Sequence, residues 1–317
     1  MFTFIKRLQE LIAQLKKNKG LWFTTLSIIS IVGIFISMYV IMTMTDRVSE
    51  KVYTSMFESY ELKLDAKVQN KHDEFKKIAA IIKQDKPLLE ALETNNIAVV
   101  DAFKKSLNEE FLKSEFNSLS IDLISATNKD KPLRNTLNAV VTGKRALSGV
   151  EVLENGVFFV HMVPLQKNEV VYGVLEIKES IHALRAQITK EGGEYLFLLD
   201  KKMLTFLSLE EKADKYKEVN ENYTLKQVEY DTKFATTINT IDSETFEKFK
   251  QSGYVLDNNY FRVAKKITDI NGVDVGLMVV GESIDVSGGF VNIAGDMTNT
   301  VTTVALGLVI SVILFLF

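Results

Sequence analysis

Three histidines and no cysteine limit the chemistry that this sequence can support. The chain has 317 residues, and His72, His161 and His182 are its only histidines. Without cysteine, disulfides, thiolate nucleophiles and cysteine-based metal sites are excluded. The sequence also has no H-E-x-x-H, phosphate-binding loop, G-x-S-x-G or dinucleotide fingerprint. We therefore expect these residues to provide no enzymatic activity and to bind no metal or cofactor.

Among the histidines, His161 has the most informative context. It alternates with Phe159 and Val163 in an apolar segment, so the three side chains would share one face of a strand. Such a histidine is either a hydrogen-bonded core residue or part of a pocket lining, and its titration near neutral pH would make a pocket responsive to pH. His72 and His182 fall on separate helical patterns with polar neighbours, and we expect both at the surface.

Three other side chains could hold a charged ligand. Arg134 precedes a short helical pattern, and a guanidinium can bind a carboxylate through two parallel hydrogen bonds. The alternative is a surface arginine beside the charged residues 129–131. Tyr172 offers a ring and a hydroxyl, and Glu151 could accept hydrogen bonds from an ammonium group. The predicted ligand-binding residues are therefore Arg134, His161 and Tyr172, with Glu151 and Phe159 beside them.

An antiparallel meander is expected to position these side chains. Strand patterns cover 119–125, 148–153, 157–165 and 170–177, and a short helical pattern covers 135–142. Asn155-Gly156 separates two of these strands. This dipeptide favours a type I′ hairpin turn, in which both residues have positive φ.

The pattern then partly repeats, which predicts two α+β domains in series. A helix at 179–189 precedes strand patterns at 194–200, 260–267 and 273–280, whereas 209–250 has a polar helical or irregular pattern. The domain boundary is expected near Gly192-Gly193.

A long amphipathic helix over 46–84 is expected before these domains. Apolar residues recur there at three, four or seven positions, without Gly or Pro. Most of this helix is expected to pack on its own domain, and a part could pair with a second copy in a homodimer. Pro87 ends the pattern, and shorter helical segments follow over 88–116.

Two uncharged segments flank this region. Residues 21–45 would form a helix of about 37 Å, enough to cross a hydrocarbon core of about 30 Å. A cleaved signal peptide has a shorter apolar core and small residues before its cleavage site, so a retained transmembrane helix is favoured. Residues 301–317 predict a second, truncated membrane helix, and we expect the protein to continue beyond Phe317.

Charge predicts the orientation. Residues 1–20 hold five Lys or Arg residues and one acidic residue, whereas the charges of 46–51 balance. The positive-inside rule then places 1–20 in the cytoplasm, where they form a short interfacial helix, and 46–296 in the periplasm of a bacterial inner membrane. The whole chain has a net charge of −3 and no basic stripe, so nucleic acid is not an expected partner.

Five groups of short motifs follow one another along the chain. They are Pro132-Leu-Arg134-Asn-Thr-Leu with Val141-Thr-Gly-Lys-Arg, Gly149-Val-Glu151 with Asn155-Gly156-Val-Phe-Phe, Met162-Val-Pro164 with Val171-Tyr-Gly-Val-Leu-Glu176, Gly192-Gly-Glu-Tyr-Leu-Phe-Leu-Leu-Asp200, and Gly272-Val-Asp-Val-Gly276. In this order they resemble the double Cache domains, the PAS-like extracytoplasmic sensors of bacterial chemoreceptors and sensor kinases, and are most similar to the third double-Cache type. The Tyr/Arg/Trp/Asp signature of the family's amino-acid receptors is not found here, and 209–250 matches no family motif.

The resemblance implies an organisation for most of 45–300. A stalk helix would cover 46–84, a membrane-distal module 85–192, a membrane-proximal module 193–285 and a return segment 286–300. Ligand would bind to the distal module, against the sheet that carries His161. A carboxylate or an amino acid-like compound is the expected ligand class.

The leading functional expectation is a transmembrane receptor for chemotaxis that signals to cytoplasmic partners through a region beyond Phe317. The sensor region of a histidine kinase or of a diguanylate cyclase is the alternative within this class. A polysaccharide chain-length regulator also places an external domain between two membrane helices, but it is mostly helical and has a proline-rich stretch before its second helix. No proline follows Pro164 here. A tethered binding protein of a transporter would not need a second membrane helix.

Overall fold

A computed structural model describes residues 19–114, 116–126, 133–227, 230–257, 259–284, 299–307 and 310–311. The chain divides into two units. The first comprises Met1–Met56 and Ile284–Phe317, and the second is Phe57–Ser283. The expected cytoplasmic segment lies almost wholly outside the described residues, as do most of the return segment and much of 301–317.

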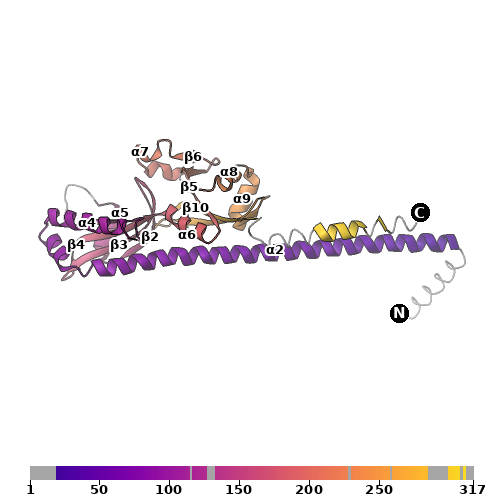
Figure 1. Ribbon diagram of the computed structural model, residues 1–317, viewed down its shortest axis with the longest axis horizontal. Coiled ribbons are helices and arrows are strands. Elements are labelled where there is room, and N and C mark those ends of the chain that lie inside the picture. The colour runs from indigo at the N-terminus through magenta and orange to yellow at the C-terminus, as the bar shows by residue number, and fades with distance from the viewer. Residues whose placement is uncertain are drawn as a thin grey trace. The chain divides into compact units, whose positions relative to one another are not determined.

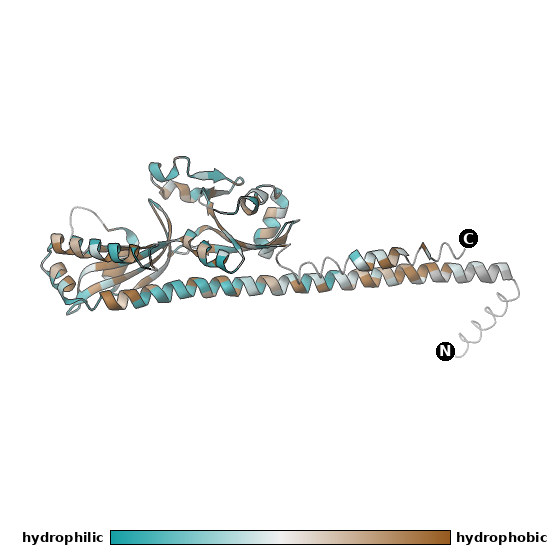
Figure 2. Cartoon of the chain, in the orientation of Figure 1, coloured by the Kyte–Doolittle hydropathy of each residue, from teal (hydrophilic) through white to brown (hydrophobic). Residues whose placement is uncertain are grey.

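Helix α2 (Lys19–Ile82) contains both the first apolar segment and the predicted stalk without a break. Its segment Ile31–Ile82 is long and apolar enough to cross a membrane. In the first unit its large apolar side chains, such as Phe35 and Tyr39, are exposed, which suits contact with lipid chains. Figure 2 shows the helix change from mostly hydrophobic to mostly hydrophilic along its length. Residues 299–307 are also helical.

The first sheet of the second unit has four antiparallel strands, in the order β1-β4-β3-β2 (Figure 1). The strands are β1 (Leu119–Ser125), β2 (Leu147–Leu153), β3 (Gly156–Lys167) and β4 (Val170–Ser180). Helix α5 (Asn135–Gly143) packs on one face through a cluster formed by Leu137, Val140, Val160, Met162 and Val174. The other face contacts α2 and α3 (Lys86–Glu93), and α4 (Ile97–Leu112) packs along the edge strand β1. The predicted meander is confirmed.

The type I′ turn is not where the sequence predicted it. Gly156 has a φ of 138°, but Asn155 is not among the described residues with positive φ. Both residues of the next two-residue loop, Asn168 and Glu169, have positive φ (49° and 62°). The hairpin predicted at Asn155-Gly156 is confirmed by the pairing of β2 with β3, but its turn lacks the type I′ backbone. The loop that joins β3 to β4 has that backbone despite having no glycine.

The second sheet has six strands, in the order β6-β7-β5-β10-β9-β8. They are β5 (Glu194–Asp200), β6 (Tyr216–Glu218), β7 (Tyr223–Lys226), β8 (Tyr254–Leu256), β9 (Tyr260–Thr268) and β10 (Asp274–Ser283). The sequence missed β6, β7 and β8, because strands of three or four residues are too short to show an alternating pattern.

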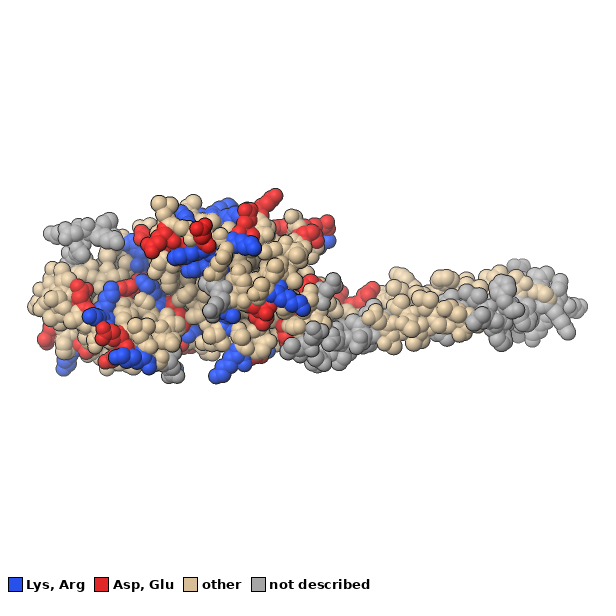
Figure 3. Space-filling model, turned by 45° about the horizontal axis from the view of Figure 1, so that its top comes forward, with Lys and Arg blue, Asp and Glu red and all other residues tan. Residues whose placement is uncertain are grey.

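Short helices accompany this sheet. In chain order they are η1 (Ile181–Ala183), α6 (Leu184–Lys190), η2 (Lys201–Phe206), α7 (Leu209–Lys212), α8 (Thr232–Ile238) and α9 (Ser243–Ser252). Phe234 of α8 and Phe246 and Phe249 of α9 form a hydrophobic core with residues of the sheet. Figure 3 shows acidic and basic side chains interspersed over the visible face of Phe57–Ser283.

The two sheets share one strand order. In the first sheet β1 pairs with β4, β4 with β3 and β3 with β2. In the second sheet β5 pairs with β10, β10 with β9 and β9 with β8. Strands β7 and β6 extend the second sheet beyond β5. The fold is therefore α+β, with a long N-terminal helix and two PAS-like modules in series. The boundary near Gly192-Gly193 stays a prediction.

Candidate functional site

The α5 face of the first sheet carries a charged cluster among apolar side chains. Strand alternation places Glu151 of β2, Met162 of β3 and Glu176 of β4 on this face, and Met162 pairs directly with Glu176. Glu151 is 8% exposed and Glu176 is 1% exposed. Buried carboxylates need compensating partners, and Arg134 supplies them.

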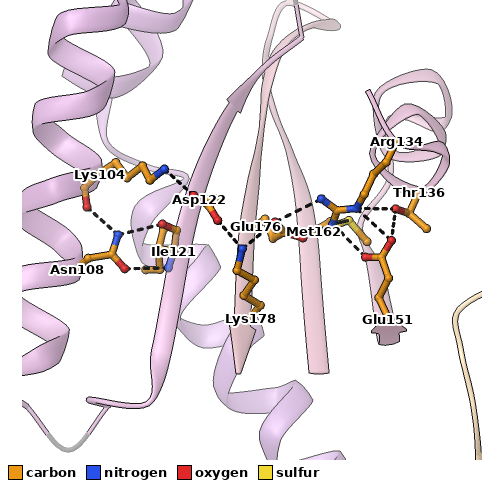
Figure 4. Close-up of polar contacts among 10 residues, drawn as sticks. All are labelled: Lys104, Asn108, Ile121, Asp122, Arg134, Thr136, Glu151, Met162, Glu176 and Lys178. Atoms are coloured by element: carbon orange, nitrogen blue, oxygen red, sulfur yellow. Dashed lines mark hydrogen bonds and ion pairs between the residues drawn. The ribbon is translucent and has the colours of Figure 1, made fainter. Parts of the chain in front are cut away.

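The guanidinium of Arg134 bonds to both carboxylates (Figure 4). Its Nε and Nη2 donate to Oε1 and Oε2 of Glu151, each at 3.0 Å, and Nη2 also donates to Oε1 of Glu176. The Thr136 hydroxyl donates to Oε1 of Glu151 at 2.6 Å. We call Arg134, Glu151, Glu176 and Thr136 the Arg134 cluster.

Local structure explains how Arg134 reaches the sheet. It is the N-cap residue of α5, with extended backbone (φ −62°, ψ 156°), and its side chain makes no cap hydrogen bond. Burial by itself would lower the pKa of Arg134, but the hydrogen bonds and charges of Glu151 and Glu176 together outweigh it and raise that pKa. The guanidinium therefore stays charged, with its donors directed at the two glutamates.

A chain of ion pairs extends the cluster across the sheet. Lys178 Nζ lies 3.8 Å from Glu176 and 2.6 Å from Asp122 of β1, and Lys104 of α4 lies 2.6 Å from Asp122. Burial raises the pKa of Asp122, but the hydrogen bonds from Lys104 and Lys178 lower it further than burial raises it. With Arg134 and Glu151, the network joins three basic and three acidic side chains, so it carries no net charge.

The predicted ligand-binding residues do not all meet. Arg134 and Glu151 lie together, and Tyr172 is on the same face of β4 as Glu176, two alternations away and half-buried. His161 and Phe159 lie on the opposite face, which packs against α2, where the ring of His72 contacts that of Phe159 at 6.3 Å. The structure therefore separates the five candidates into two groups on either side of the sheet.

His161 is 3% exposed, and the hydroxyl of Ser148 lies 2.7 Å from its Nδ1. Burial, followed by the nearby charges of His72 and Lys76, lowers the pKa of His161 to about 4. The neutral ring is therefore the form that the fold favours near neutral pH.

The surface positions expected for His72 and His182 are wrong. His72, on the side of α2 that faces the sheet, is half-buried, and its Nδ1 is shielded with no partner among the described residues. His182 packs edge-on against Phe197 at 6.2 Å, and burial, then the charge of Lys226, lowers the pKa of His182 to about 4. Polar neighbours in the sequence do not mark an exposed face here, because Lys71, next to His72, and Glu179, three residues before His182, are buried and form a 2.9 Å ion pair.

The sequence reasoning did not single out Glu176, Lys178 or Asp122. A signal was present, because Glu176 interrupts the apolar run 173–177 of a strand, where a charge is costly unless it is paired. Among the described residues, no group of His, Asp and Glu side chains is arranged to hold a metal ion.

The described residues form a long helix followed by two PAS-like α+β modules, the layout that the resemblance to double Cache domains implies. No protein-family model matches the sequence, and no curated protein matches it either.

Several solved structures are similar to this chain. The sensor domain of the histidine kinase DctB from V. cholerae is 11% identical, over 73% of this chain and 98% of that one, with a TM-score of 0.37. A domain of a sensory box/GGDEF family protein from Vibrio parahaemolyticus is 10% identical, over 75% and 98%, with a TM-score of 0.45. The ligand-binding domain of the Pseudomonas fluorescens chemoreceptor CtaA, in complex with L-leucine, is 15% identical, over 73% and 96%, with a TM-score of 0.34. No residue role is carried over from these proteins.

Proposed function

We propose that this chain is the sensor region of a bacterial transmembrane receptor and that a small molecule binds on the α5 face of the first module. The observation that carries this proposal is the Arg134 cluster. Glu176 and Glu151 are buried charges beside the apolar cluster under α5. Apolar residues of similar volume would stabilise such a site as well or better, so the retained charges favour recognition over packing.

The charge of the network favours a ligand that carries both signs. Arg134 already bonds to two carboxylates, so a dicarboxylate would add negative charge to an array in which every carboxylate is paired. An amino acid-like zwitterion can exchange its carboxylate for one glutamate on Arg134 and give its ammonium group to the released glutamate. This exchange leaves no buried charge unpaired. Tyr172, on the same face, would contribute its ring and hydroxyl.

The sequence supports the remaining parts of the proposal. The basic residues before the first apolar segment favour a cytoplasmic N-terminus and a periplasmic sensor. A chemotaxis receptor is the favoured output, and a histidine kinase or a diguanylate cyclase is the alternative. The ligand must bind the two signalling states with different affinities in order to shift their populations.

A thermal-shift screen of the full chain in lipid nanodiscs tests the binding proposal. Amino acids, dicarboxylates and simple amines form its three arms, because a ligand that binds the folded state raises the melting temperature by mass action. We expect amino acids to stabilise the protein, Arg134→Ala to abolish this effect, and Arg145→Ala, at an exposed position near the end of α5, to preserve it. Stabilisation by dicarboxylates alone, or equal stabilisation of Arg134→Ala, would refute the proposed site.

A further inference from the structure

The second module covers an open edge of the first sheet. Strand β2 is at the end of the order β1-β4-β3-β2, so the backbone groups on its outer side have no strand partner within that sheet. One carbonyl group of β2 and one of the turn that follows it are bound by the second module. The Ile270 N–H donates to the Val150 oxygen at 3.0 Å, and the Ser208 N–H donates to the Glu154 oxygen at 2.8 Å. These two contacts lie on either side of Glu151.

Ile270 also enters the apolar environment of the proposed site. It is half-buried against the cluster of Leu137, Val140, Val160, Met162 and Val174 on the α5 face. Its approach requires a glycine on β2, because a Cβ at Gly149 would lie 2.7 Å from Ile270 Cγ1. A residue of the second module therefore packs against the apolar cluster on the α5 face of the first module.

Internal hydrogen bonds fix the conformation of the turn between β9 and β10. Asp269 Oδ1 accepts from the N–H groups of Asn271 and Val273, each at 2.8 Å, and the Asp269 N–H donates to the Val273 oxygen. Gly272 has the positive φ (81°) that the turn needs. Such a turn transmits a displacement to the strands it joins.

The turn leads directly into a central strand. β10 pairs with both β5 and β9, and at its end Glu282 accepts a 2.6 Å hydrogen bond from the Tyr60 hydroxyl of α2. A continuous set of contacts therefore runs from Glu151, through Val150, Ile270 and β10, to the long helix. Packed elements of this kind carry coupling when they have two alternative arrangements.

We propose that the β9–β10 turn couples the Arg134 cluster to the second module, with Ile270 as the positioning residue that senses displacement of β2. The inference rests on the proposed function only in one respect, namely that a bound ligand is what displaces Glu151. A ligand that draws Glu151 away from Arg134 shifts β2, and Ile270 transmits the shift to β10.

Hydrogen exchange in the full chain, in lipid nanodiscs and without ligand, tests this coupling. Glu151→Gln perturbs the cluster, because its amide group presents a donor to Arg134 Nη2. We expect this variant to change amide exchange in β10 by about fivefold or more, the range of ordinary intersite coupling. In an Ile270→Ala background, Glu151→Gln should change the rate of amide exchange in β10 by less than about twofold.

Val273→Ala is the matched control, because it alters an exposed side chain of the same turn and should leave the response to Glu151→Gln intact. Gly149→Ala should change β10 exchange with the Arg134 cluster unaltered, because it pushes directly on Ile270. A change over 134–151 that does not reach β10, or one that reaches β10 equally in Ile270→Ala, would overturn the coupling. No ligand is used, so a failed ligand screen leaves this result standing, and failed coupling leaves the binding result standing.

Discussion

The two modules use the corresponding face of the same strand order in opposite ways. In the first, Arg134 reaches from the start of a helix to two glutamates on the sheet. In the second, Arg262 reaches from β9 to α8, where Nη1 donates to the Phe234 oxygen at 2.9 Å and Nη2 donates to the Thr237 hydroxyl. The first face carries a chain of ion pairs, whereas on the second face a single arginine is buried against aromatic rings.

The surroundings of the two arginines differ in a way that fits the recognition role proposed for Arg134. Arg262 is fully buried, with its guanidinium 4.2 Å from the centre of the Phe234 ring and 4.8 Å from that of Tyr260. Burial lowers the pKa of Arg262, although its hydrogen bond to Asp257 opposes this. A cation fixed by a helix carbonyl, a single carboxylate and two rings contributes to packing. A cation shared by two glutamates can exchange partners, which recognition requires.

Removal of Arg262 should have the largest effect. Arg262→Ala leaves Asp257 and the Phe234 carbonyl without their partner and opens a cavity, so the free energy of unfolding should fall by about 3–5 kcal/mol. Chemical denaturation followed by circular dichroism measures this loss. Lys266→Ala, at an exposed position of the same strand, should stay within about 0.5 kcal/mol. A loss below about 1 kcal/mol for Arg262→Ala would remove the distinction between the two faces.

Removal of Arg134 should lower the free energy of unfolding by less, about 1–3 kcal/mol, because its side chain is 29% exposed and water can partly replace it. The triple variant Arg134→Met, Glu151→Leu, Glu176→Leu should recover that stability, since it leaves no charge of the cluster unpaired. It should also abolish the thermal shift produced by ligand. A triple variant that unfolds would show that the cluster is a structural element like Arg262.

The stability of the protein should fall as the pH falls through the window set by His161 and His182. The pKa of His161 and that of His182 are lowered to about 4, below the value of about 6.5 in an unfolded chain. The unfolded state therefore binds more protons between about pH 6.5 and 4, and stability declines as the pH falls through that interval.

Each histidine should lower the free energy of unfolding by on the order of 1–2 kcal/mol between pH 7 and 5. His161→Gln and His182→Gln should each reduce the dependence of stability on pH in this interval, and the double variant should reduce it further. Denaturation at a series of pH values measures these slopes. Slopes identical to that of the unmodified protein would contradict the burial of both rings.

The smallest predicted effect concerns the loop between β3 and β4. Glu169 has a φ of 62°, and its 3.8 Å ion pair with Lys144 is exposed, so it is worth little. Glu169→Gly should stabilise the protein by up to about 1 kcal/mol, because glycine adopts this backbone without strain. Gly156→Ala, at a φ of 138°, should have the opposite sign. The melting temperatures of the two variants measure both effects, and destabilisation by Glu169→Gly would contradict the turn geometry.

The sequence by itself determined the elements with strong periodicity. The long helix, the meander of β2, β3 and β4, and strands β5, β9 and β10 follow from the spacing of apolar residues, because each period matches one backbone geometry. It also identified Arg134 and Glu151, whose charges stand next to apolar segments. It did not reveal β6, β7 or β8, whose three or four residues are too few to show a period.

Only the tertiary structure decided which candidates meet. Alternation places His161 and Phe159 on one face of their strand. The register that puts Glu176 on the opposite face, and the packing of α5 and α2 on the two faces, come from the tertiary structure. The pairing of Arg134 with Glu176 joins residues 42 positions apart, and the contact of Ile270 with Val150 joins two modules. Such contacts depend on how finished elements pack against one another, and the local spacing of residues along the chain does not contain that information.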